Sequence, residues 1–250
     1  MFRMLKLNPP NGWRAVVWEL AIVTLGVLIA LAVQQWAENR SWDARTRLAS
    51  AAIKRELADH YKWSVEWRVA TPCLTAQIDR LKQRVQDSGA RLEPAPTHTN
   101  PYTGKFVLRM PTKDYLSNAW QSAISDGVTS HLDDQTRDRL SAHYAIVQIL
   151  VPMTWQNNND AHILLGLGRP IPLDPTVRYS MLRTLDEIGG RIAIMDFLTA
   201  ELIGHVQKLD MVPPAATVQS EVASRGIFRF CQENHLPIRS FEKAMSGESN

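Results

Sequence analysis

The chain has 250 residues, of which 45% are hydrophobic and 21% charged, and its formal net charge is +3. This composition is that of a folded protein and excludes a disordered chain, a collagen-like repeat and a disulfide-rich miniprotein. Most of the positive excess lies in residues 1–33, so residues 34–250 are nearly neutral and lack the basic surface that would indicate nucleic acid as a partner.

The first predicted element is a membrane-spanning helix over residues 15–33. This apolar run holds one ionisable side chain, Glu19. As an α-helix it would extend roughly 28 Å at about 1.5 Å per residue, close to the ~30 Å hydrocarbon core of a bilayer. Indole rings favour the membrane–water interface, and four tryptophans stand near the two ends of the run as predicted interface anchors: Trp13, Trp18, Trp36 and Trp42. The segment predicts a single-pass protein held in a lipid bilayer.

The flanks of this helix indicate an orientation. Residues 1–14 form a short basic tail without an acidic residue, which favours a cytoplasmic tail and a periplasmic bulk domain, although arginines on the far side weaken the positive-inside argument. A cleaved signal peptide is the alternative, because residues 30–32 (Ala-Leu-Ala) match a small-x-small cleavage pattern. The run is longer than the roughly 7–15 apolar residues of a signal peptide, which favours an uncleaved anchor.

Glu19 has two interpretations. An ionisable residue inside a membrane helix usually faces a partner, so Glu19 is a candidate contact to another membrane protein. It also lies about one turn inside the cytoplasmic end, where it could reach headgroup water or Arg14. The sequence leaves both interpretations open.

The start of the chain resembles a known family. The residues that carry the resemblance are Trp18-Glu19, the run Gly26-Val27-Leu28-Ile29-Ala30-Leu31, Gln35-Trp36, Glu38 and Arg40. They resemble a family of uncharacterised bacterial single-pass membrane proteins with a basic N-terminal tail, a GVLIAL-type membrane helix and a helical extracytoplasmic domain. The resemblance implies a bacterial inner-membrane location, and it implies no activity and no catalytic residue.

Residues 34–70 contain neither proline nor glycine, so the membrane helix is expected to continue outward as a rod. Apolar residues of the rod recur at helical period and are expected to pack on the rest of the domain: Trp42, Ala49, Ile53, Leu57 and Trp67. Thr71-Pro72 has the pattern of an N-cap followed by a first-turn proline, and predicts a second helix that ends at Gly89. Residues 90–111 hold four prolines and predict a loop, with a short strand at 105–110.

Further helices are predicted from capping and breaking residues. Thr112 is expected to begin one that Gly127 ends, and residues 133–151 form another that Pro152 kinks or ends. The polar run 157–160 (Asn-Asn-Asn-Asp) opposes helix. Asp174-Pro175 begins the helix with the best apolar pattern, which Pro213-Pro214 closes, and a last short helix covers residues 218–230.

These elements predict an all-α fold in which one N-terminal transmembrane helix continues into a four- or five-helix periplasmic bundle. The predicted divisions are a cytoplasmic tail (1–14), a transmembrane helix (15–33), a helical extracytoplasmic domain (34–240) and a flexible C-terminal tail (241–250). The extracytoplasmic part is long enough to form its own core.

The two cysteines, Cys73 and Cys231, both fall in the part predicted to lie outside. An oxidising compartment permits a disulfide between them, which would tie distant segments of the chain together. Two buried free thiols are the alternative, whereas a catalytic Cys–His pair lacks any flanking signature.

The seven histidines show no metal-binding spacing such as H-E-x-x-H. Small polar clusters at 131–134 and 160–162 could ligate a metal if a third ligand approached, but helix caps and solvated faces are the favoured explanation for them. The sequence therefore assigns no catalytic residue, no cofactor and no metal ligand.

The function that the sequence favours is that of a binding or interaction domain in the cell envelope. Its expected partners are the bilayer and another membrane or envelope protein, or a second copy of itself. The short tail is far below the ~50 residues of a small domain, so a signal across the membrane would have to pass through such a partner. A periplasmic enzyme, with a metal or acid–base site assembled from distant residues, is the alternative.

Overall fold

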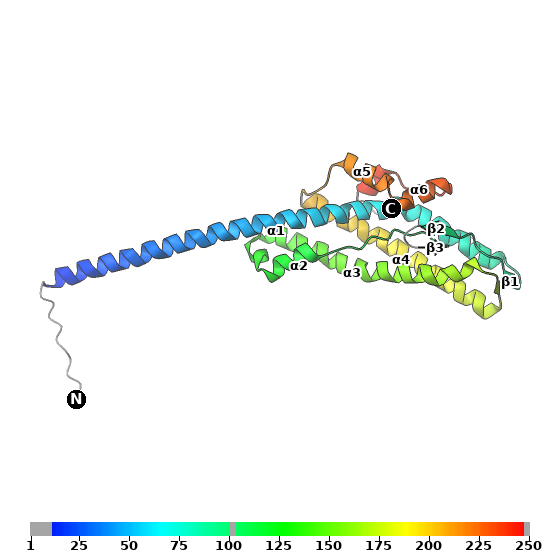
Figure 1. The fold of residues 1–250 in the computed structure, drawn as a ribbon, viewed down its shortest axis with the longest axis horizontal. Helices are drawn as coiled ribbons and strands as arrows, with labels where there is room; N and C mark the ends of the chain where they lie inside the picture. The colour runs from blue at the N-terminus through cyan, green and yellow to red at the C-terminus, as the bar shows by residue number, and fades with distance from the viewer. Residues whose placement is uncertain (1–11, 101–103, 248–250) are drawn as a thin grey trace, which may run out of the picture.

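The computed structural model describes residues 12–100 and 104–247 and confirms the all-α fold (Figure 1). Seven α-helices lie in these ranges: α1 (Gly12–Asp87), α2 (Asn118–Ser125), α3 (Asp134–Leu164), α4 (Pro175–Lys208), α5 (Ala215–Ala223), α6 (Gly226–Glu233) and α7 (Phe241–Met245). The shorter elements there are the 3-10 helices η1 (Val128–His131) and η2 (Leu165–Gly168) and the strands β1 (Arg91–Leu92), β2 (His98–Asn100), β3 (Gly104–Phe106) and β4 (Ile171–Pro172). β1 pairs with β4 and β2 with β3, both antiparallel. Most of the predicted cytoplasmic tail, residues 1–11, lies outside the described ranges.

Helix α1 is 76 residues long, about 110 Å at the usual rise of about 1.5 Å per residue. Figure 1 shows its N-terminal part projecting alone from the domain. This part is long and apolar enough to cross a membrane, and its apolar stretch has no residue buried inside the protein. The helix predicted at 15–33 therefore continues without a break into the domain.

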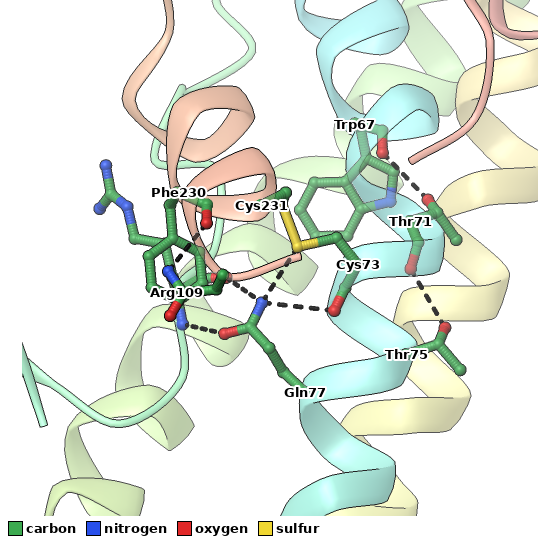
Figure 2. The surroundings of a disulfide bond; sticks show 9 residues. Trp67, Thr71, Cys73, Thr75, Gln77, Arg109, Phe230 and Cys231 are labelled. Atoms are coloured by element: carbon green, nitrogen blue, oxygen red, sulfur yellow. Dashed lines mark hydrogen bonds between the residues drawn. A yellow bond between two sulfur atoms is a disulfide. The ribbon is translucent and has the colours of Figure 1, made fainter. Parts of the chain in front are cut away.

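The prediction of a new helix at Thr71-Pro72 is wrong, because α1 runs straight through Pro72. Proline removes one backbone donor and its ring crowds the preceding turn, and Figure 1 shows α1 changing direction within the domain. Hydroxyl groups on either side bond back to the helix: Thr71 Oγ1 donates to Trp67 O at 3.0 Å and Thr75 Oγ1 to Thr71 O at 3.1 Å (Figure 2). Burial of the neighbouring Cys73 and Leu74 holds the helix together across the proline.

The core lies between α1, α4 and α3. Helix α4 lies along the C-terminal half of α1, and α3 packs on α4, while α2, α5, α6 and α7 each contact α1. Each fully buried aliphatic side chain contributes about 1.5–3 kcal/mol, and the largest of these come from all three long helices: Ile53, Leu57, Leu74, Ile78, Leu140, Leu150, Leu185, Ile188 and Ile192.

Helix α3 passes through both Pro152 and the polar run 157–160. Pro152 therefore does not end the helix, which was one of the two outcomes predicted for it, and the prediction that the polar run opposes helix is wrong. A partner on α4 explains the second case. Arg191 Nε donates to Asn157 Oδ1 at 3.0 Å, and the Arg191 guanidinium also forms an ion pair with Asp160. The side chains of Asn157 and Asp160 are thus bonded by another helix and do not compete for the backbone of their own.

Thr112 does not begin a helix, because α2 starts at Asn118. The amide of Ala119 in its first turn donates to the Glu56 carboxylate on α1 at 3.0 Å, so a distant residue sets this start. Gly127 follows the end of α2 as predicted, with a left-handed φ of 71° that favours glycine. The predicted strand at 105–110 is β3, which is displaced and ends at Phe106.

The start of α4 is confirmed: Asp174 accepts a hydrogen bond from Val177 N at 2.9 Å, and Pro175 occupies the first turn. The single helix expected at 218–230 is two helices, α5 and α6, separated at Arg225, which has extended backbone. The tail expected to be flexible from residue 241 instead contains α7. Arg68 of α1 holds α7 by donating to Ala244 O at 3.0 Å.

Candidate binding pocket

A pocket of about 620 Å³ opens beside the C-terminal part of α1, far along the chain from its exposed apolar stretch. Its volume lies within the usual range for small-molecule sites. Five segments supply its walls: α1 with the residue after it, the loop that follows β1, the first residue of β2, the residue after β3, and the end of α6 with the residues beyond it. The lining side chains are Gln77, Arg80, Leu81, Gln83, Arg84, Asp87, Ser88, Glu93, Ala95, Pro96, His98, Val107, Phe230, Asn234 and Leu236.

Helix α1 contributes one face to the pocket, because Gln77, Arg80, Leu81 and Arg84 recur at three- and four-residue steps. Gln77 anchors the segment after β3 to this face. Its amide oxygen accepts from Arg109 N at 2.8 Å and its nitrogen donates to Arg109 O at 3.2 Å (Figure 2). Both polar atoms of Gln77 are thus used within the protein, and the residue positions a wall of the pocket.

The disulfide between Cys73 and Cys231 forms the second attachment, as predicted from the two cysteines (Figure 2). It joins α1 to α6 across 158 residues of sequence, with a Cα–Cα distance of 6.0 Å. Phe230, the neighbour of Cys231, lines the pocket. The bond therefore fixes the wall that α6 supplies.

The loop wall is held by backbone contacts. Arg84 Nη2 donates to Glu93 O at 3.1 Å and to Pro94 O at 2.7 Å, and Ala95 N donates to Leu167 O at 2.8 Å. The loop lies so close to η2 that a side chain on Gly168 would meet Thr97 at 2.7 Å. These contacts order the loop through its backbone and leave the exposed carboxylate of Glu93 unused.

The charges in the pocket are mixed. Three charged side chains form no ion pair or side-chain hydrogen bond with any residue in the described ranges: Arg80 on α1, Asp87 about two turns further along, and Glu93 on the loop. Aromatic and aliphatic groups lie opposite, and the His98 and Phe230 rings meet edge to face at 4.9 Å. The pocket thus combines an apolar surface with unneutralised charges of both signs, a typical ligand-site composition.

The predicted membrane residues lie apart from this pocket. Glu19 is exposed on the projecting part of α1, as are Trp13, Trp18 and Trp36. Trp42 differs, because it is half-buried and its ring stacks on His131 of η1 at 4.1 Å. The folded domain therefore begins at the Trp42 ring.

The two polar clusters considered as metal ligands have other partners. Besides the stacked His131, Asp133 caps α3 by accepting from Thr136 N at 2.9 Å, and Asp160 pairs with Arg191. His162 is exposed. Within residues 12–100 and 104–247, no three histidine, cysteine, aspartate or glutamate side chains are placed to hold a metal ion.

A buried histidine pair in the core was not predicted from the sequence. His60 Nε2 donates to Leu116 O at 2.7 Å, so its Nδ1 must accept the bond of 2.9 Å from His143 Nε2 in the neutral pair. Burial lowers the pKa of His60 to about 4, and burial together with the neighbouring His60 and His205 lowers that of His143 well below its usual value. These residues lie 83 positions apart, and neither carries a local motif that could have revealed the pairing.

A second buried polar cluster joins the C-terminal segment to the long helices. Arg239 makes a two-point contact with the Asp196 carboxylate of α4, at 2.7 and 2.9 Å, and the buried Arg68 donates to Asp196 O at 3.2 Å. This cluster fastens the C-terminal segment on α1 and α4. Its role is structural, because each group is used within the protein.

Comparison of the chain with known protein families, with curated proteins and with solved structures finds no match. The family resemblance of the N-terminal helix therefore stays a prediction.

Proposed function

We propose that this chain is a single-pass bacterial inner-membrane protein that holds a helical ligand-binding domain in the periplasm. One observation carries the proposal: α1 is continuous from an exposed apolar stretch at one end to a pocket wall at the other. The same helix would thus be both the anchor and part of the binding site.

The disulfide supports the periplasmic side of the bilayer. Structural disulfides persist in oxidising compartments and are rare in the bacterial cytosol. Cys73 and Cys231 both lie beyond the apolar stretch, and their bond fixes α6 against α1. With a cytoplasmic domain the pocket wall would lose this attachment.

The redox state of the two cysteines in cells tests this placement. Cells that express the full chain are quenched with acid, and the denatured protein is treated with a maleimide–polyethylene glycol reagent. We expect no added mass unless a reductant is used first. A chain that lacks residues 12–33 serves as the control, because it should stay in the cytosol and gain mass on both thiols. Modified thiols in the full chain without reductant would contradict the proposal.

A further inference from the structure

The unneutralised charges of the pocket are separated along α1. Arg80 and Asp87 are seven residues apart, which corresponds to about 10 Å along the helix axis. Arg80 lies on the side of Gln77 and the disulfide, whereas Asp87 lies toward the loop that carries Glu93. Arg84 also lies toward this loop, where its Nη2 is used by the carbonyl oxygens of Glu93 and Pro94. The pocket therefore has a positive end at Arg80 and an opposite end at which two carboxylates outnumber one arginine.

The larger part of the surface between these ends is apolar, although polar side chains such as Gln83 and Asn234 also line it. Leu81 projects from the same face of α1, and Val107, Phe230 and Leu236 come from the other walls. A ligand that complements the arginine end, the apolar surface and the carboxylate end has an anionic group, an apolar middle and a cationic group about 10 Å from the anionic one. An extended peptide advances about 3.3–3.6 Å per residue, so roughly three residues span this distance.

Resting on the proposed function, we propose that the pocket binds a short peptide of about three residues with both termini free. Its carboxylate would lie at Arg80 and its ammonium group at Asp87 and Glu93, with an apolar side chain against Leu81 and Phe230. An arginine guanidinium suits a carboxylate because it can donate two parallel hydrogen bonds. Specificity would come from the two termini, since the walls between them offer mainly apolar contact.

The test is calorimetric titration of the full chain in detergent with three probes. They are the peptide Ala-Leu-Ala, its N-acetylated form and its C-terminal amide. We expect the free peptide to bind, and each blocked form to bind about tenfold more weakly, because each lacks one charge-assisted contact. Equal binding of all three probes, or no binding of the free peptide at about 10 mM, would overturn the proposal.

Two pocket variants assign the termini. Arg80→Gln should remove the preference for a free carboxylate and keep the preference for a free ammonium group, and Asp87→Asn should do the reverse. Both side chains are exposed and make no bond within the described part of the chain, so neither change should affect folding. Arg183→Gln, a matched change on the outer face of α4, should leave both preferences intact. A carboxylate preference that survives Arg80→Gln would contradict the assigned direction.

A negative result for peptide binding would leave the proposed function in place. A chain with bonded cysteines that ignores all three probes would remain a membrane-anchored protein, and only the peptide assignment would be lost. Binding that depends on the carboxylate alone would identify the pocket as a general anion site and would equally overturn the two-terminus proposal.

Discussion

The two halves of α1 use similar apolar side chains in opposite surroundings. In the N-terminal half Leu25 is 58% and Ile29 56% exposed, whereas in the C-terminal half Leu57 and Leu74 are completely buried by other helices. Exposed apolar surface of this extent needs a partner, and in our proposal lipid supplies it. The first half of α1 can be recognised from its apolar composition alone, whereas in the second half the contacts with other helices determine which side chains are buried.

The largest expected effect concerns the exposed half. Replacing Leu25 and Ile29 together by arginine should prevent stable membrane insertion, because each arginine near the centre of a span adds about 2.5–3.5 kcal/mol to the insertion free energy. Alkaline carbonate extraction of membranes measures the loss. Leu48→Arg is the matched control, because Leu48 is 74% exposed yet lies beyond the apolar stretch. Equal behaviour of the two variants would break the comparison.

Within the domain the disulfide should have the largest effect. The chain-entropy model gives about 4–5 kcal/mol for a loop of this length, and the bond joins residues 158 positions apart. We expect Cys73→Ser with Cys231→Ser to lower the free energy of unfolding by up to that amount in urea titrations. Adding a reductant should have no effect on this variant but should destabilise the natural chain.

A buried arginine should contribute more to the free energy of unfolding than an exposed one, so the contrast between the two halves of α1 extends to charged side chains. Arg68, 1% exposed, donates to carbonyls of α4 and α7, so Arg68→Met should remove about 3 kcal/mol from the free energy of unfolding. Arg183 pairs with Glu187 on the surface, and Arg183→Met should change stability by less than about 1 kcal/mol. Similar losses from both would contradict this account of the C-terminal segment.

The histidine pair makes the domain sensitive to acid. Below pH 6.5 the unfolded chain takes up a proton on His60, whereas the folded chain resists protonation until about pH 4. Stability should thus be complete above pH 6.5 and fall by about 3 kcal/mol as the pH drops toward 4. His60→Gln should reduce this dependence in urea titrations, with the remainder due to the buried His143, and His162→Gln, at an exposed position, should leave it unchanged.

The smallest effect distinguishes two helix starts. Asp174 caps α4 with its side chain, whereas Ser117 precedes α2 without a side-chain capping bond. Asp174→Ala should lower the free energy of unfolding by about 1 kcal/mol, and Ser117→Ala by less than about 0.5 kcal/mol. Thermal unfolding resolves the difference. An equal loss of stability in both variants would show that the Asp174 capping bond does not stabilise α4.

Local signals predicted those parts of the fold that local chemistry decides. The apolar stretch of α1, the Asp174-Pro175 start and the turn at Gly127 each depend on a few neighbouring residues. Pro72 and Asn157 misled because distant packing decides both positions. The helix around Pro72 is buried by other helices, and Asn157 is bonded by Arg191 of α4. A local pattern contains neither partner. The C-terminal tail misled for the same reason, since Arg68 holds α7 from a distant helix.

Of the candidate pocket, only the cysteines were predictable. Arg80, Asp87 and Glu93 are ordinary surface charges in the sequence, and Phe230 lies more than a hundred residues away from them. The pocket exists because the disulfide, the Gln77 contact and the Arg84 contact bring separate segments together. Such tertiary contacts leave no periodic pattern.

Protease treatment of intact spheroplasts that express the full chain tests the central claim most directly. If α1 spans the bilayer and the domain lies outside, added proteinase K should remove the domain and leave a short membrane-bound fragment with the N-terminal tail. A full-length chain that resists digestion until detergent is added would contradict the account. Release of the domain into the soluble fraction before protease is added would contradict it as well.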